Sequence, residues 1–371
     1  MKIKEFKLEE YFAKYEFKVK YLLCSSDCES FSVNELLTLE DNSIEELKQK
    51  RLGYSESLGD PILRNEISNL YTNILPDDVI IFSGAEEAIF IFMNVQLDKG
   101  DHIIVQYPAY QSLFEVASAI GCEVTKWMMT DENFWELDIS FLEETIKKNT
   151  KAIIINCPHN PTGYLMSQKK MDAILDIAKK NNIHVFSDEV YRLLEYDKSD
   201  RLSNASDCYS KAISLGVMSK AFGLAGLRIG WIATKDKLLY NKLASFKNYT
   251  TICNSALSEF FAILALRNKK FILQRNLKII EKNLKILEYF FNKFKNLFKW
   301  IKPKASSIAF PRILTDESID DFCLELLRKK SILLMPSSKY DYGDKHFRIG
   351  FGRMNMDQGL LKLEEFIEEK Y

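Results

Sequence analysis

The chain has 371 residues, with 51 lysines and arginines against 52 aspartates and glutamates. This length exceeds the usual size of a single hydrophobic core, so two or three compact units are expected. The near-zero net charge argues against nucleic acid or an anionic membrane surface as partners, which leaves small molecules and other protein chains.

The seven cysteines predict reduced thiols rather than disulfides or a metal site. Only Cys24 and Cys28 lie close together, and no second pair completes a zinc-binding pattern. The first 17 residues are charged and amphipathic, and no later segment approaches about 18 uncharged apolar residues. These features predict a cytoplasmic protein with no membrane partner.

The N-terminal region is expected to be helical and then irregular up to about residue 45. Its polar segment LLCSSDCESFS is expected to form a loop that could close over a site. A helix is predicted from Asp60 to Tyr71, because Asp60 and Pro61 are typical cap and first-turn residues and apolar residues follow at helical spacing.

Short β-branched runs then alternate with amphipathic segments of 10 to 15 residues. The predicted strands are 79–83, 102–106, 122–127, 151–156, 184–188, 212–216 and 229–234. The predicted helices between them include 86–96, 110–120, 139–148 and 167–181. This alternation predicts an α/β fold with a mostly parallel sheet sandwiched by helices. Ligands bind at the carboxyl ends of the strands in such sheets.

After about residue 255 the pattern changes to long helices, the longest predicted at 270–297. A second, smaller α/β unit is predicted from strands 306–313, 331–335 and 345–351 with helices 317–329 and 356–369. The expected organisation is an N-terminal arm (1–45) that packs with the small domain, a large domain (46–265) and a C-terminal small domain (266–371).

The segment GVMSKAFGLAGLRIGW, residues 216–231, carries two cations among apolar neighbours. Partial burial makes Lys220 and Arg228 costly unless each has an anionic or covalent partner. A desolvated lysine can form a Schiff base, and an arginine can clamp a phosphate. The alternative interpretation is a surface turn with two solvated charges.

Polar residues also follow the ends of other predicted strands. A Gly-Ala turn after Ser83 opens a helix, and the free amides of Ala85 and Glu86 suit a phosphate, although many helices begin this way. Tyr110 follows the next strand, where its ring could lie against a planar cofactor or belong to the core.

Two further strand ends carry an amide and a carboxylate. Two prolines and a glycine restrict the backbone of the segment NCPHNPTG, residues 156–163, so the side-chain amide of Asn160 is expected to point in a fixed direction. This rigidity favours a binding site, and a structural Asx-turn is the alternative. Asp188 ends an apolar strand, with Tyr191 just beyond it. This carboxylate needs a partner, either Arg228, a helix amide or a protonated heterocyclic nitrogen.

Together these residues suit pyridoxal phosphate, an aldehyde on a pyridinium ring with a phosphate group. The order of the motifs resembles the class I/II aminotransferases of the aspartate aminotransferase fold, from about Tyr54 to Arg348. The resemblance implies this fold, this cofactor and amino-group transfer between an L-amino acid and a 2-oxo acid.

The resemblance also implies roles for individual residues. Lys220 would hold the cofactor as a Schiff base and later move a proton between the substrate α-carbon and the cofactor C4′ carbon. Asp188 would keep the ring nitrogen protonated. The remaining implied roles are contacts of Asn160 and Tyr191 with the phenolate oxygen, stacking by Tyr110, phosphate binding by Ala85, Glu86 and Arg228, and α-carboxylate binding by Arg348.

Tyr54 would reach the phosphate of a neighbouring subunit, so the resemblance implies a homodimer with shared sites. For Arg348 the alternative is a basic residue alternating along an edge strand. The chain departs from the family at Val217, where many members carry a phosphate-binding serine, which leaves Ser219 or Ser214 as substitutes.

No second arginine for an acidic substrate side chain is identifiable. Asp27 and Glu29 in the predicted N-terminal loop motivate the hypothesis of a basic substrate side chain, with a solvated acidic loop as the alternative. A lyase or cyclase with the same cofactor, acting by elimination chemistry on an arginine-like amino acid, is the second functional reading. A binding protein without turnover is the third, and the absence of a DNA-binding segment before Tyr54 argues against it.

Overall fold

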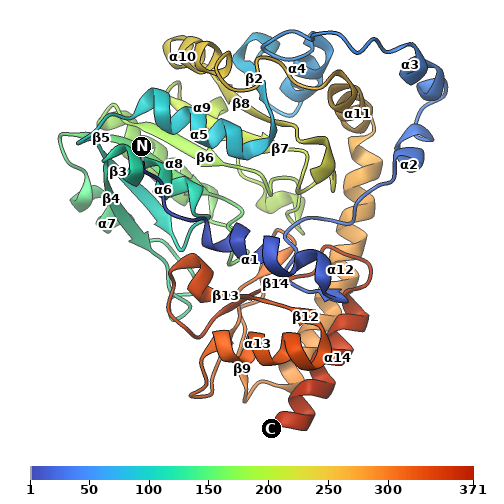
Figure 1. Cartoon of the computed structure of the whole chain (residues 1–371). Helices are drawn as coiled ribbons and strands as arrows, with labels where there is room; N and C mark the ends of the chain where they lie inside the picture. Colours follow the sequence, from blue (N-terminus) through green and yellow to red (C-terminus); the bar gives the residue numbers. More distant parts are fainter. Residues whose placement is uncertain (1) are drawn as a thin grey trace.

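A computed structural model of the chain describes residues 2–371 and contains one large sheet of seven strands (Figure 1). The strand order is β2-β8-β7-β6-β5-β3-β4, and all strands run parallel except β8, which is antiparallel to both neighbours. The strands are β2 (Val79–Phe82), β3 (His102–Tyr107), β4 (Glu123–Met128), β5 (Thr150–Asn156), β6 (His184–Asp188), β7 (Ala212–Val217) and β8 (Gly230–Thr234). The predicted α/β class and the seven predicted strands are confirmed.

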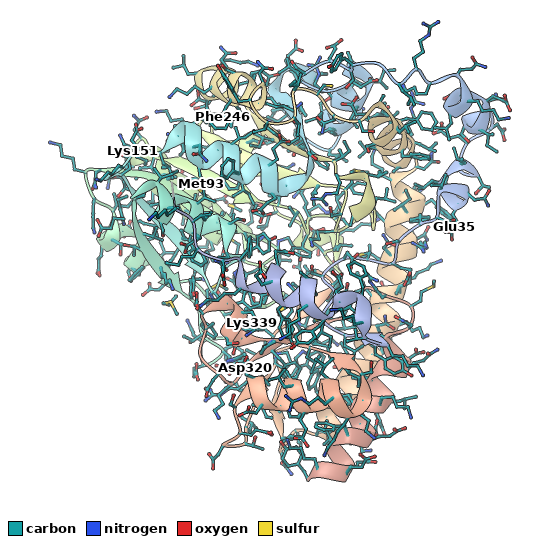
Figure 2. All side chains as sticks on the ribbon, in the orientation of Figure 1. Glu35, Met93, Lys151, Phe246, Asp320 and Lys339 are labelled. Carbon is teal, nitrogen blue, oxygen red and sulfur yellow. The ribbon has the colours of Figure 1, made fainter. Side chains whose placement is uncertain are left out.

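Helices cover both faces of this sheet, which explains why its strands are apolar almost throughout. In β5, Ala152 and Ile154 pack into one core, and Ile153 and Ile155 pack into the other. One face carries α5 (Gly84–Gln96), α6 (Ser112–Ile120) and α10 (Lys237–Lys247), and the other carries α7 (Ile139–Thr145), α8 (Gln168–Lys180) and α9 (Ala205–Cys208). Met93 of α5, labelled in Figure 2, is fully buried on the first face.

The strand register brings the predicted chemistry to one edge of the sheet. Asn156 pairs with Asp188, and Asp188 pairs with Leu215, two residues before the end of β7. Gly230, the first residue of β8, pairs with Val217 on one side and Phe82 on the other. The antiparallel β8 therefore begins where its neighbours end, so Arg228 meets the residues that follow β2, β5, β6 and β7.

The C-terminal part begins with α11 (Ala256–Arg267) and α12 (Lys269–Lys293), which runs down to α14 in Figure 1. Three small sheets follow, in the orders β10-β14-β13, β11-β9 and β1-β12. Their elements are β9 (Phe298–Lys299), β10 (Ile308–Ala309), β11 (Arg312–Ile313), α13 (Ile319–Lys330), β12 (Ile332–Leu333), β13 (Met335–Pro336), the 3-10 turn η5 (Ser337–Tyr340), β14 (Phe347–Gly350) and α14 (Met356–Lys370).

Two strand predictions in this part are wrong in extent. The expected strand 306–313 is broken into β10 and β11, which pair with different strands, β14 and β9. Pro311 lies at the break and has no N–H to donate to a ladder. The expected strand 331–335 likewise divides into β12, which pairs with β1, and β13, which pairs with β14.

The N-terminal segment lies against these small sheets through residues 7–29, whereas its residues 33–37 pack against α11. It contains α1 (Lys7–Tyr15), the 3-10 turn η1 (Glu16–Lys18), β1 (Tyr21–Leu22), α2 (Val33–Leu37) and α3 (Ser43–Gln49), and α4 (Pro61–Ser68) follows with Asp60 as its cap. Strand β1 adds to β12 in parallel. Lys339 of η5, labelled in Figure 2, lies 5.5 Å from the ring of Tyr11 in α1.

The loop after β1 is packed closely on β14. The N–H of Gly350 donates to the carbonyl oxygen of Leu23 at 2.7 Å, and a Cβ atom on Gly350 would lie 1.8 Å from the carbonyl oxygen of Ser25. Only glycine permits this approach. The polar loop predicted from the sequence is thereby held beside the strand that carries Arg348.

Candidate active site

A cavity of about 530 Å³ opens at the carboxyl edge of the large sheet. The N-terminal segment and Arg348 of β14 form its other walls. Ten of the eleven site residues predicted from the sequence line it: Ala85, Glu86, Tyr110, Asn160, Asp188, Tyr191, Ser219, Lys220, Arg228 and Arg348. Tyr54 does not line it, and its side chain is 91% exposed.

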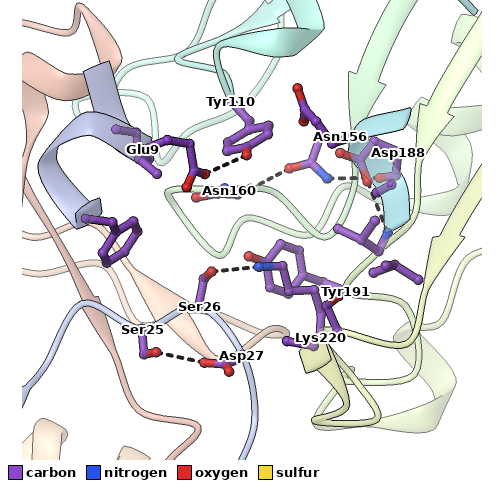
Figure 3. A pocket seen from close by; sticks show the side chains of 18 of the residues that line it. Glu9, Ser25, Ser26, Asp27, Tyr110, Asn156, Asn160, Asp188, Tyr191 and Lys220 are labelled. Atoms are coloured by element: carbon purple, nitrogen blue, oxygen red, sulfur yellow. Dashed lines mark hydrogen bonds between the residues drawn. The ribbon is translucent and has the colours of Figure 1, made fainter. Parts of the chain in front are cut away.

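Lys220 follows β7 and reaches into the cavity. Its Nζ donates to Ser26 Oγ at 2.9 Å, and it lies 6.0 Å from the centre of the Tyr191 ring (Figure 3). Burial lowers the pKa of Lys220 from its ordinary value, while Asp27 acts in the opposite direction. A depressed pKa favours the uncharged amine, which is the nucleophilic form.

Asp188 is the last residue of β6 and is buried. Its Oδ1 accepts a hydrogen bond from the N–H of Val190 at 3.2 Å. Within residues 2–371 it forms no ion pair, and Arg228, the partner considered from the sequence, instead donates to the carbonyl oxygen of Ala225 at 3.1 Å. Burial raises the pKa of Asp188 to about 7, because the N–H of Val190 and the charge of Lys220 only partly offset the lost hydration.

Asn156, which the sequence analysis did not single out, connects two predicted site residues. Its Oδ1 accepts from the backbone N–H of Asn160 at 2.6 Å, and its Nδ2 donates to the backbone oxygen of Asp188 at 2.9 Å (Figure 3). The side chain of Asn156 therefore positions the Asn160 loop over the end of β6. The sequence could have indicated Asn156, because it is a polar residue at the end of the predicted strand 151–156.

Arg348 is only 1% exposed, and β14 is the central strand of its sheet, so the edge-strand alternative is wrong. Its Nε and Nη2 donate to the carbonyl oxygen of Cys24 at 3.1 and 2.8 Å. Its Nη1 donates to Asn160 Oδ1 at 3.2 Å and to the hydroxyl of Tyr340 at 2.6 Å. The guanidinium is thus held by three separate segments of the chain.

Tyr340 is a second residue that sequence reasoning missed. It is buried in η5, and its hydroxyl also donates to Asn160 Oδ1 at 3.1 Å. It connects the arginine that faces the cavity with the Asn160 loop. No local pattern in the sequence distinguishes it from an ordinary core tyrosine.

The first turn of α5 forms a cradle beside Arg228. Gly84 has a φ of +83°, and a Cβ atom on it would lie 2.6 Å from Arg228 Nη2. Arg228 itself adopts the left-handed conformation, with a φ of +51°, which is costly for a side chain of this kind. The amides of a helix N-terminus and a guanidinium converge here, as an anionic group would require.

Of the two serines considered as substitutes at Val217, only Ser219 lies on the cavity. Val217 and Ser219 both line the cavity, whereas the hydroxyl of Ser214 donates to Glu189 Oε1 at 2.8 Å away from it. Glu86 accepts from Ser112 Oγ at 3.1 Å, and burial raises the pKa of its carboxyl to about 7.

Two tyrosines face the cavity from different elements. The hydroxyl of Tyr110 donates to Glu9 of α1 at 2.7 Å (Figure 3). The centre of the Tyr110 ring lies 4.9 Å from the centre of the Phe6 ring. The hydroxyl of Tyr191 is buried and has no hydrogen-bond partner among the described residues. An orphaned buried hydroxyl in a cavity indicates a ligand contact.

Of the two acidic residues considered in the N-terminal loop, Asp27 lines the cavity and Glu29 does not. Asp27 is paired with Arg353, whose Nη2 lies 2.9 and 3.1 Å from its two oxygens. Glu29 instead accepts from the N–H of Met354 at 2.8 Å. Neither carboxylate is free for a substrate side chain.

Comparison with known proteins shows which family the chain belongs to. Residues 19–362 match the aminotransferase class I and II family. The chain is 28% identical to the probable aspartate aminotransferase of Methanocaldococcus jannaschii, over 93% of this chain and 95% of that protein. It is 26% identical to the capreomycidine synthase of Streptomyces vinaceus, over 96% and 92%. A crystal structure of a PLP-dependent aminotransferase from Streptococcus suis has a TM-score of 0.94 and 31% identity, covering 100% and 99% of the two chains.

The chain belongs to the class I and II aminotransferases. It is a pyridoxal-phosphate-dependent enzyme of the transaminase type, as the sequence resemblance implied.

The cavity fits this cofactor on its own chemistry. Asp188 lacks a cation that a protonated ring nitrogen would supply, and the Tyr191 hydroxyl lacks a partner. The start of α5 beside Arg228 suits a phosphate. Within residues 2–371, no group of three or more potential ligands is placed to hold a metal, and none of the helices has the length and apolarity needed to span a membrane.

The raised pKa of Asp188 predicts that this residue lowers the free energy of unfolding of the cofactor-free protein in a pH-dependent way. The folded-state pKa of about 7 exceeds the ordinary value of 3.8, so this carboxyl makes folding less favourable as the pH rises from about 4 to about 7. Asp188→Asn removes that cost. Between pH 5 and pH 8, the free energy of unfolding of the wild type should fall relative to the variant by on the order of 2 kcal/mol.

Urea denaturation of both cofactor-free proteins at the two pH values measures this difference. Asp176→Asn, on the exposed face of α8, serves as the control and should follow the wild type. Parallel pH profiles for the wild type and Asp188→Asn would mean that Asp188 is already compensated within the chain.

Proposed function

We propose that this cavity transfers amino groups between an L-amino acid and a 2-oxo acid, with Lys220 as the covalent attachment point of the cofactor. The proposal rests on one observation above all: the desolvated amine of Lys220 and the unpaired carboxylate of Asp188 lie in the same cavity at one sheet edge. A lysine near a buried carboxylate is the pair that a pyridinium aldehyde requires.

The other lining residues orient the cofactor. The amides of Ala85 and Glu86, the hydroxyl of Ser219 and the guanidinium of Arg228 would hold its phosphate. Tyr110 would pack against its ring. Asn160 and the unpartnered hydroxyl of Tyr191 hydrogen-bond its phenolate oxygen.

Bound pyridoxal phosphate supplies an electron sink that stabilises negative charge on the amino acid's α-carbon. Asp188 sustains this property by keeping the ring nitrogen protonated. The amine of Lys220 would also carry a proton between the substrate α-carbon and the cofactor. Its lowered pKa suits it to that task near neutral pH.

Arg348 binds the substrate α-carboxylate. Its Nη1 already engages Asn160 and Tyr340, and its Nε and Nη2 engage Cys24, so a carboxylate displaces part of this network. The hydroxyl of Tyr340 holds the guanidinium of Arg348 in place when no substrate is bound. Tyr340 is thus a positioning residue for Arg348.

The covalent role of Lys220 is tested by borohydride reduction of the protein with pyridoxal phosphate. The reduced cofactor should be recovered on the peptide that contains Lys220. Lys220→Ala should lose this adduct and at least about 10³-fold of its transamination rate, because it lacks both nucleophile and proton carrier. Lys151→Ala, on an exposed position of β5, is the control that should retain both. An adduct on another lysine would refute the assignment.

A second candidate is a lyase or cyclase reaction on the same cofactor, possibly on an arginine-like amino acid. The similarity to a protein named capreomycidine synthase favours keeping it, since one fold hosts several outcomes of the same carbanion.

Product analysis with and without pyruvate or 2-oxoglutarate separates the two reactions. For transamination, we expect turnover to require the oxo acid and to consume it in equal amount to the amino acid. Sustained turnover of the amino acid without any oxo acid would favour elimination or cyclisation instead.

We also propose a homodimer with shared sites. Tyr54, at 91% exposure, and Leu52, at 79%, are large apolar side chains on the surface. They adjoin the segment with exposed Tyr249 and Ile252, because Ser55 Oγ donates to the carbonyl oxygen of Asn254 at 2.9 Å. A patch of this kind fits an interface, and Tyr54 would complete the partner's phosphate site.

Subunit mixing tests the shared site. A hybrid of Lys220→Ala and Tyr54→Ala subunits contains one site with both residues intact. Mixing and refolding the two impaired variants should restore up to about a quarter of the wild-type activity, since half of the random dimers are hybrids with one complete site. A dimeric mass by sedimentation with no rescue would place Tyr54 outside the site, and a monomeric mass would exclude the dimer.

The division into an arm (1–45), a large domain (46–265) and a small domain (266–371) remains our proposal. The pairing of β1 with β12 supports joining the arm to the small domain. Seven unpaired cysteines support a cytoplasmic location, where thiols stay reduced.

A further inference from the structure

The charges that line the cavity are unevenly distributed. Among the described residues its cations are Lys220, Arg228 and Arg348, and the proposed function uses all three. Helix α1 and turn η1 contribute the carboxylates of Glu9 and Glu16 to the opposite wall. No cation is left over on the lining for an acidic substrate side chain.

Glu9 and Glu16 lie on one face of the arm with Phe12 between them. Their spacing of three and four residues places all three side chains on the same side of a helical segment. Phe6 precedes them at the same spacing and packs against Tyr110. The wall therefore alternates aromatic rings with carboxylates, the combination that binds guanidinium and ammonium groups.

This wall adjoins the proposed carboxylate-binding arginine. The guanidinium carbon of Arg348 lies 5.8 Å from the centre of the Phe12 ring. An amino acid held by its α-carboxylate at Arg348 is therefore next to Phe12, with Glu9 and Glu16 on either side along the arm. Glu9, Phe12, Glu16 and Arg348 all line the same cavity of about 530 Å³, so the wall faces the space in which the substrate would lie.

The two carboxylates differ in their present contacts. Glu9 accepts the hydroxyl of Tyr110 at 2.7 Å. Glu16 has neither a hydrogen bond nor an ion pair from its side chain among the described residues, although it is only half exposed. Burial raises its pKa, and Arg353, which already pairs with Asp27, acts against this. A cationic ligand would give Glu16 the partner it lacks.

We propose that the substrate of this enzyme carries a cationic side chain, a guanidinium or an alkylammonium, which binds between Phe12 and the carboxylates of Glu9 and Glu16. The inference rests on the proposed function and refines it. The sequence hypothesis placed the recognition of this cation at Asp27 and Glu29. The present proposal places it at Glu9 of α1 and Glu16 of η1. Aspartate and glutamate are disfavoured, because their side chains would face two carboxylates with no cation to receive them.

Matched pairs of amino acids test the charge requirement in the wild-type holoenzyme. L-arginine and L-citrulline differ by one charge at nearly equal size, as do L-lysine and L-norleucine. The rate at which each amino acid changes the cofactor absorbance in single turnover, with no oxo acid present, gives kcat/KM for the first half-reaction. We expect each cation to exceed its neutral counterpart by at least about tenfold, and L-glutamate to react most slowly.

Glu16→Gln locates the effect. It should lower kcat/KM for L-arginine by about tenfold and leave L-citrulline unchanged, since only the charge contact is lost. Glu10→Gln, one residue from Glu9 on the exposed side of α1, is the matched control and should behave as the wild type.

Equal rates for arginine and citrulline, or a preference for glutamate, would overturn the inference even if Glu16→Gln failed to fold. A uniform loss for both members of a pair in Glu16→Gln would also overturn it. If no amino acid changes the cofactor absorbance and no adduct forms at Lys220, the proposed function itself fails, so the two failures are distinguishable.

Discussion

The site is organised around the carboxylate of Asp188, which the fold buries without giving it a cationic partner. The register of the sheet places it beside Asn156 and beside Leu215, two residues before the end of β7, and the lysine that follows β7 lines the same cavity. A buried carboxyl in this state is costly to ionise, and its pKa rises to about 7. In the proposed function a protonated heterocycle would remove this cost, so the site would be complete only with the cofactor bound.

A second constraint joins the sheet to the rest of the chain. Arg348 of β14 is held by the carbonyl oxygen of Cys24 in the arm, by Asn160 beside the sheet and by Tyr340 of η5. Its position therefore depends on all three parts being assembled. The close packing of Ser25 on Gly350 also holds the arm loop against β14, the strand that carries Arg348. The proposed binding of the α-carboxylate and of the substrate side chain would thus both depend on the placement of the arm, in which α1 supplies Glu9 and η1 supplies Glu16.

Much of this arrangement follows from the sequence because parallel strands bring their carboxyl ends together. Lys220, Asp188 and Asn160 could be grouped on that basis alone. What escaped prediction depends on contacts between segments far apart in the chain. Tyr340 and the carbonyl of Cys24 matter only because they meet Arg348. Tertiary packing likewise decides that Glu9 of α1 and Glu16 of η1 face the cavity. One strand was predicted at 306–313 because the run is largely apolar, but Pro311 divides it into β10 and β11.

The central claim is that Asp188 holds a proton on the ring nitrogen of the cofactor. The 15N chemical shift of pyridoxal phosphate labelled at this nitrogen, measured in the wild-type holoenzyme at pH 8, tests it most directly, because the protonated and neutral rings give well-separated signals. We predict the signal of a protonated ring in the wild type and of a neutral ring in Asp188→Asn. A neutral ring in the wild type would contradict the account, since the buried carboxylate would then have another partner.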